Sequence, residues 1–134
     1  MILADTSAWI EFLRGTGSAL SVRLRELLIS DEVATTDAVV MEVLTGARDA
    51  ADHERLRRLL WRCDFVATEG PRDYESAAEI SLACRQAGER IRWLIDCLIA
   101  GVAIRANVPI LTADADFDTI ARHTPLQLVK VSGS

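Results

Sequence analysis

The sequence contains few of the residues on which disulfide frameworks, zinc sites and many catalytic centres depend. Its three cysteines, Cys63, Cys84 and Cys97, are odd in number and widely spaced, which favours buried, reduced thiols over disulfides or a zinc site. The two histidines, His53 and His123, lack a context that would mark a catalytic base, so both are predicted to lie at the surface. Cysteine and histidine chemistry is therefore not expected to carry the function.

The chain also lacks long apolar runs and a targeting segment. None of its apolar runs approaches the roughly 20 residues that a membrane-spanning helix needs. Residues 1–7, MILADTS, have neither the basic start nor the length of a signal peptide. With 134 residues, 50% of them hydrophobic, the chain is predicted to form a single packed domain, 1–134, in the cytoplasm.

Positive charge is scarce as well. The formal net charge of −5 argues against a protein that holds nucleic acid by bulk electrostatics. Every basic residue except Lys130 is arginine, whose guanidinium suits phosphate contacts, but a genome of high G+C content would produce the same bias. The overall charge therefore leaves the partner open.

Short apolar runs alternate along the chain with segments of helical spacing, which predicts an α/β fold with a parallel sheet. Gly70 and Pro71 are interpreted as a break between a strand and a helix, and a polar tail is expected after residue 131. Strands are expected at residues 1–4, 32–36, 65–68, 108–113 and 126–131, and helices at residues 6–14, 20–29, 37–46, 49–62, 74–87, 95–106 and 117–122.

Two aspartates follow expected strands. Asp5 lies at the carboxyl end of the first strand, and Asp114 lies just past the carboxyl end of the fourth. In open α/β sheets the ligand crevice forms at that edge, where the strand order reverses. If the first and fourth strands are neighbours, the two carboxylates converge.

Two more acids interrupt apolar segments. Glu42 has small neighbours one turn away on its expected helix. Asp96 opens a helix that is apolar almost all round, and as an N-cap it would have a purely structural role. Taken singly, each of the four acids also allows a structural interpretation. Taken together, they favour a shared site.

Clustered carboxylates raise one another's pKa unless a cation neutralises them. Hard oxygen ligands select magnesium or manganese, and such sites leave coordination positions for water and substrate phosphate. The reaction class implied is metal-assisted phosphodiester hydrolysis, which requires no lysine, histidine or cysteine nucleophile.

Competing sites fail on particular residues. An EF-hand loop that starts at Asp114 would require Gly and Glu where Thr119 and Pro125 stand. A haloacid dehalogenase-type phosphotransferase would have a second aspartate where Ser7 stands, and a receiver domain would have its lysine in another segment than Lys130. No glycine-rich phosphate loop is present.

The acidic positions and their contexts resemble the PIN-domain ribonucleases, and more narrowly the VapC toxins of type II toxin–antitoxin pairs. The resemblance spans nearly the whole chain and implies a three-layer fold with a central parallel sheet of four to five strands flanked by helices. It is carried by Asp5 in ADTS, Glu42 in VVMEVLTG, Asp96 in IDCLIAGVAI, and Asp114 and Asp116 in ILTADADF.

Carried over residue by residue, the family's catalytic and metal-binding cluster falls on these five acids, with Asp5 and Asp96 as the best candidates for direct ligands. Ser7 and Thr112 match small hydroxyl positions that would orient carboxylates or waters. Asp118 is expected to serve only the end of its helix.

The resemblance also implies a magnesium or manganese ion, RNA as the substrate, a homodimer, and a cognate VapB-type antitoxin. That antitoxin would lay a segment across the acidic groove, often with an arginine against the acids. The alternative is a non-catalytic module that keeps the fold and binds a basic peptide in the groove.

Several residues invite an interpretation as RNA contacts. Among the aromatics, Trp9 and Phe12 share a helical face and are predicted to pack in the core or a dimer contact, whereas Trp93 leaves base stacking open. The predicted phosphate contacts around the site are Arg14, Arg48, Arg90 and Arg92.

Overall fold

The structure is a computed structural model that describes residues 1–131; the polar tail expected at residues 132–134 lies outside the described residues. Within residues 1–131, no helix combines the length and the apolar composition needed to cross a membrane. The strands are β1 (Ile2–Ala4), β2 (Val33–Thr35), β3 (Asp64–Phe65) and β4 (Ile110–Leu111), and the helices are α1 (Thr6–Leu13), α2 (Ala19–Ile29), α3 (Asp37–Thr45), α4 (Ala50–Leu60), α5 (Gly70–Gln86), α6 (Leu94–Ala106) and α7 (Ala115–His123).

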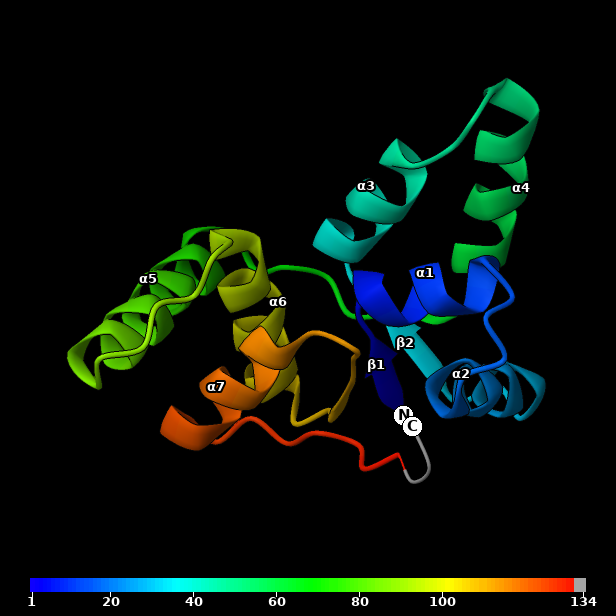
Figure 1. Ribbon diagram of the computed structural model, residues 1–134. Coiled ribbons are helices and arrows are strands. Elements are labelled where there is room, and N and C mark those ends of the chain that lie inside the picture. Colours follow the sequence, from blue (N-terminus) through cyan, green and yellow to red (C-terminus); the bar gives the residue numbers. More distant parts are fainter. Residues whose placement is uncertain (132–134) are drawn as a thin grey trace.

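The four strands form one parallel sheet in the order β3-β2-β1-β4. Leu3 of β1 pairs with Ala34 of β2 on one side and with Ile110 of β4 on the other. Helices α5, α6 and α7 pack together beside the sheet, and α1 to α4 form a second group across from them (Figure 1). This architecture confirms the predicted α/β fold with a central parallel sheet.

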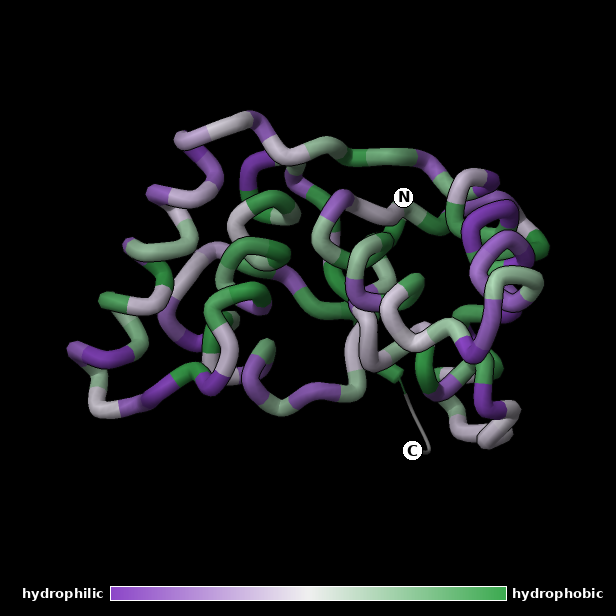
Figure 2. Tube along the Cα trace, turned by 90° about the horizontal axis from the view of Figure 1, so that it is seen from above, coloured by the Kyte–Doolittle hydropathy of each residue, from purple (hydrophilic) through white to green (hydrophobic). Residues whose placement is uncertain are grey.

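The core lies between the sheet and these two groups of helices. Trp9 of α1, Leu24 of α2 and Phe117 of α7 are fully buried around the strands. Hydrophobic segments run through the middle of the molecule and hydrophilic ones lie mostly at its periphery (Figure 2). Helix α6 is apolar almost all round, which predicts that it is buried. Its central residues 99–103 are indeed all buried.

The prediction of a last strand over residues 126–131 was wrong. Over residues 126–131 the structure has only an isolated parallel bridge, between Leu128 and Ile110. Two backbone hydrogen bonds accompany it, from Ile110 N–H to Gln127 O and from Val129 N–H to Ile110 O, both 2.9 Å. The apolar alternation of this segment therefore reflects its packing beside β4 rather than an extended ladder.

Two helices begin earlier than predicted. Gly70 and Pro71 do not precede α5 but form its first turn, where proline is tolerated because its missing N–H would have no partner within the helix. Helix α7 begins at Ala115 because the side chain of Asp114 accepts a hydrogen bond from Asp116 N–H and caps it. The third strand is shorter than predicted and ends at Phe65.

Candidate metal centre

The first and last strands along the chain, β1 and β4, place the candidate site. Strands β1 and β4 are neighbours, and Asp5 N–H donates to Leu111 O at 3.1 Å. The chain proceeds from β1 outward to β3 and then returns to β4 on the other side of β1, so the strand order reverses between β1 and β4. The segments after these two strands, residues 5–7 and 112–116, therefore lie side by side.

Asp5 is buried and held by three donors. Its Oδ1 accepts hydrogen bonds from Ser7 Oγ at 2.7 Å and from Ala8 N–H at 2.9 Å, and its Oδ2 accepts one from Thr112 Oγ1 at 2.7 Å. The bond from Ala8 makes Asp5 the N-cap of α1. Asp5 thus ends β1, starts α1 and presents a fixed carboxylate at the sheet edge.

Ser7 and Thr112 tie the two segments together. The Ser7 hydroxyl accepts a hydrogen bond from Ala113 N–H at 2.8 Å, and the Thr112 hydroxyl accepts one from Asp114 N–H at 2.9 Å. The two hydroxyls lie 3.2 Å apart. Both residues therefore contact acids or their backbones, as the predicted orienting role requires.

Three carboxylates converge beside Asp5. Oxygens of Asp96, Asp114 and Asp116 lie within 4.8 Å of one another. Asp96 is 8% exposed, and its Oδ2 is buried without a hydrogen-bond partner. Three hard oxygens at this spacing, one of them unsatisfied, fit a divalent cation such as Mg²⁺.

The alternative interpretation of Asp96 as an N-cap was wrong. Helix α6 begins one turn earlier than that interpretation requires, with Trp93 as the N-cap residue, and Asp96 N–H donates to Trp93 O at 3.1 Å. The Asp96 side chain makes no capping bond. Its carboxylate is therefore not committed to the helix end.

The electrostatics of the cluster are unfavourable without a cation. Burial, followed by the charges of Asp114, Glu42, Asp5 and Asp116, raises the pKa of Asp96 to about 7. Burial also raises the pKa of Asp5 to about 6, although three hydrogen bonds oppose that rise. The other four predicted acids therefore lie close enough to act on the Asp96 carboxyl group.

Glu42 reaches the site from α3, and its charge acts on Asp96. Its Oε1 accepts a hydrogen bond from Thr6 Oγ1 at 2.6 Å. Thr6 was missing from the residues predicted from the sequence, because a threonine that follows the N-cap is common in helices and carries no signal of a partner 36 residues away.

Four arginines were predicted to contact phosphate around the site, and one of them, Arg92, makes a hydrogen bond to an acid of the cluster. Arg92 N–H donates to Asp116 Oδ2 at 3.4 Å, which places the loop with Arg90 and Arg92 beside the acids. Arg14 follows the far end of α1, about 13.5 Å along the helix from Asp5. Arg48 contacts Asp52 of α4 at 3.4 Å. The substrate role of all four arginines remains a prediction.

The histidines and cysteines do not join the site. His53 is exposed as predicted, but His123 is only partly exposed because it contacts Glu89. Cys84 and Cys97 are buried, and Cys63 is partly buried. All three cysteines are free thiols, in agreement with the prediction.

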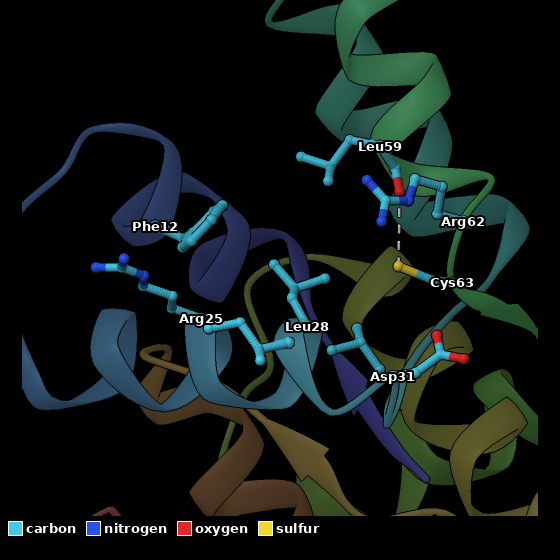
Figure 3. Close-up of a pocket in the computed structure, with 9 residues that line it drawn as sticks. Phe12, Arg25, Leu28, Asp31, Leu59, Arg62 and Cys63 are labelled. Carbon is cyan, nitrogen blue, oxygen red and sulfur yellow. Dashed lines mark hydrogen bonds between the residues drawn. The ribbon is translucent and has the colours of Figure 1, made fainter.

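A separate cavity of about 320 Å³ lies between α1, α2 and α4. Phe12, Leu28 and Leu59 come from these three helices and line it (Figure 3). The Cys63 thiol there lies 3.8 Å from Leu59 O, and burial raises its pKa to about 11, so it is protonated and a poor nucleophile. This cavity offers no hydrolytic chemistry.

The aromatic residues have different environments. Trp9 is fully buried and packs edge to face against Phe12, with ring centroids 6.1 Å apart, as the predicted core packing requires. Trp93 is 59% exposed at the start of α6. A role of Trp93 in base stacking stays a prediction.

Comparisons with known proteins agree with this geometry. The pattern of the PIN domain family matches residues 2–123. Ribonuclease VapC11 of Mycobacterium tuberculosis is 45% identical over 129 residues, which cover 95% of this chain and 96% of the relative. Ribonuclease VapC5 of the same species is 30% identical over 132 residues, which cover 95% and 93%.

Solved structures share the fold. VapBC2 from Rickettsia felis, bound to a DNA fragment from its promoter, superposes with a TM-score of 0.74 and 19% identity over 96% of this chain and 98% of the other. VapBC-1 from nontypeable Haemophilus influenzae gives a TM-score of 0.74 and 19% identity over 97% and 98%. At these identities the likeness extends to the fold alone.

Proposed function

This chain belongs to the PIN-domain family as a relative of the VapC ribonucleases, and on that premise we propose that it is a magnesium- or manganese-dependent endoribonuclease. Its substrate is RNA, and its biological role is that of the toxin in a toxin–antitoxin pair. The five acids of the cluster are the catalytic and metal-binding residues: Asp5, Glu42, Asp96, Asp114 and Asp116.

The observation that carries this proposal is the unsatisfied oxygen of Asp96. A buried carboxylate oxygen that has no partner within residues 1–131 is costly, and the Asp96 carboxylate that carries it also lies within 4.8 Å of oxygens of two more carboxylates. A metal ion is the partner that satisfies all three at once. Basic peptides offer the same charge, which makes peptide binding the outcome to exclude.

The residues of the site have different roles. Asp96, Asp114 and Asp116 would hold the ion where their oxygens converge, and Asp5 and Glu42 would complete the metal-binding set beside them. Ser7 and Thr112 keep Asp5 fixed, so little reorganisation is needed when the substrate binds. The bound ion would activate a water and neutralise charge on the phosphate during hydrolysis.

The test is cleavage of total cellular RNA by purified protein with Mg²⁺ or with EDTA. Asp96→Asn should lower the rate at least about a hundredfold, the typical cost of removing an electrostatic group from an active site. Asp118→Asn is the matched control, because Asp118 lies on α7, the helix that carries Asp116, but is exposed. It should retain the rate.

Cleavage that continues in EDTA or in Asp96→Asn would contradict the metal mechanism. A folded protein that cleaves no RNA under any of these conditions would favour the peptide-binding module instead.

We also propose that this chain binds a VapB-type antitoxin, forms a homodimer and lies in the cytoplasm. Support comes from solved neighbours that are toxin–antitoxin complexes. Light scattering of the protein alone should give the mass of two chains. Coexpression with the protein encoded by the adjacent small gene should give a stable complex that no longer cleaves RNA.

A further inference from the structure

Thr6 contacts the candidate centre directly and has no role in the account above. It is the first residue of α1 and follows Asp5, which caps that helix. Its hydroxyl donates to Glu42 Oε1 at 2.6 Å, a short bond to an ionisable acceptor across two helices. Within residues 1–131 this is the only hydrogen bond that the Glu42 carboxylate accepts.

Glu42 needs an external restraint more than Asp5 and Asp114 do. Asp5 accepts three hydrogen bonds, and Asp114 is fixed by its cap of α7. Glu42 has a longer side chain on the partly exposed face of α3, and its charge acts unfavourably on Asp96. Repulsion would drive a free glutamate outward into solvent, where its charge is better hydrated.

We propose that Thr6 is a positioning residue, which holds the Glu42 carboxylate over the acidic cluster against the repulsion of Asp96 and its neighbours. The proposal deepens the proposed function and rests on it for the catalytic consequence. The three residues after β1 then have separate tasks. Asp5 belongs to the cluster, Thr6 orients Glu42, and Ser7 orients Asp5.

The chain offers clean variants for a test. Thr6→Val keeps the branched shape and removes the hydroxyl, whereas Thr6→Ser keeps the hydroxyl. Thr45→Val is the matched control, because Thr45 lies on α3 and its hydroxyl donates only to the backbone at Met41 O, 2.7 Å away. All three variants should fold, since Thr6 is not in the core.

The kinetic readout is the rate of RNA cleavage at saturating Mg²⁺ and RNA. Thr6→Val should lower kcat about tenfold, in line with a lost hydrogen bond to a charged group, with little change in KM. Thr6→Ser should recover most of that loss, and Thr45→Val should match the wild type. In an E42Q background, Thr6→Val should cause no further loss, because the two residues act as one unit.

The second readout does not depend on ribonuclease activity. In crystal structures of the protein, Thr6→Val should displace the Glu42 carboxylate from the cluster, and Thr6→Ser should leave it in place. Calorimetry should show severalfold weaker manganese binding in Thr6→Val, and wild-type binding in Thr6→Ser and Thr45→Val.

The proposal is overturned if Glu42 stays in place in Thr6→Val, or if the kcat losses of Thr6→Val and E42Q multiply. Wild-type protein that binds manganese with Glu42 held by Thr6, yet cleaves no RNA, would refute the proposed function and leave the positioning role supported.

Discussion

At the scale of single residues, the main feature is a buried aspartate that lacks a partner. Burial, followed by the charges of four neighbouring acids, raises the pKa of Asp96 to about 7. Within residues 1–131, its Oδ2 accepts no hydrogen bond. Such a group lowers the stability of the fold whenever it is ionised without a cation. The same feature that supports hydrolysis therefore has a cost in stability.

Asp96→Asn should stabilise the cation-free protein at pH 8, because it removes the buried charge and keeps the shape. We expect the free energy of unfolding to rise by about 1–3 kcal/mol, measured by urea denaturation in EDTA. Asp118→Asn should change it by less than about 0.5 kcal/mol. A less stable Asp96→Asn would show that the carboxylate is already satisfied.

The stability of the cation-free protein should fall as pH rises from about 4 to 7. The folded protein keeps protons on Asp96 and Asp5, with pKa values of about 7 and about 6, over a range in which the unfolded chain with pKa 3.8 has released them. The folded state thus binds more protons, and each group can cost up to about 1.4 kcal/mol per pH unit.

Urea denaturation at pH 5 and pH 8, with EDTA and with Mg²⁺, checks this dependence. Mg²⁺ should stabilise the protein more at pH 8 than at pH 5, since the cation and protons compete for the same oxygens. Equal stabilisation at both values would argue against binding at the cluster.

At the scale of secondary-structure elements, an arginine clamp joins α5 to α6. Arg105 near the end of α6 binds the buried Asp73 of α5 through two bonds of 3.0 Å. The same guanidinium donates to Ala67 O at 2.8 Å and to Glu69 at 3.1 Å. The clamp thereby holds the entry to α5 against the helix that carries Asp96.

Arg105→Ala should destabilise the protein by about 3–5 kcal/mol, because Asp73 is only 1% exposed and would remain as an unpaired buried charge. Arg105→Lys should recover only part of this loss, since an ammonium cannot make two parallel bonds. Arg58→Ala is the control: its pair with Glu54 is exposed and should contribute less than about 1 kcal/mol. Thermal or urea denaturation measures all three variants.

The elements also show what the sequence can and cannot predict. Alternating apolar runs and helical spacing were sufficient for the strands β1, β2 and β4 and the helices, because burial of one face dominates these segments. The starts of α5 and α7 were missed because they depend on local features, a proline in the first turn of α5 and the side-chain cap by Asp114, and the same residues are also typical of turns.

The candidate site was only partly accessible from the sequence. Asp5 and Asp114 could be placed together because parallel strands share an edge. The hydrogen bond between Thr6 and Glu42 could not be predicted, because it depends on how α1 packs against α3. The unsatisfied state of Asp96 likewise emerges only from the packed structure.

At the scale of the whole molecule, the proposed toxin role predicts a defined phenotype. Expression of the wild-type chain without its antitoxin should arrest bacterial growth, and Asp96→Asn at the same protein level should not. Coexpression of the antitoxin should restore growth. Growth curves with immunoblots check this, and normal growth with abundant active protein would count against the role.

The strand order has one more consequence, for the time at which the protein becomes active. Asp5 leaves the ribosome well before its donor Thr112 and the acids of α7, because Thr112 comes 107 residues after Asp5 in the chain. A nascent chain that has not yet exposed β4 lacks two of the three clustered carboxylates. Translation itself therefore delays the proposed nuclease until the segment after β4 has emerged, which gives an antitoxin already present time to meet it.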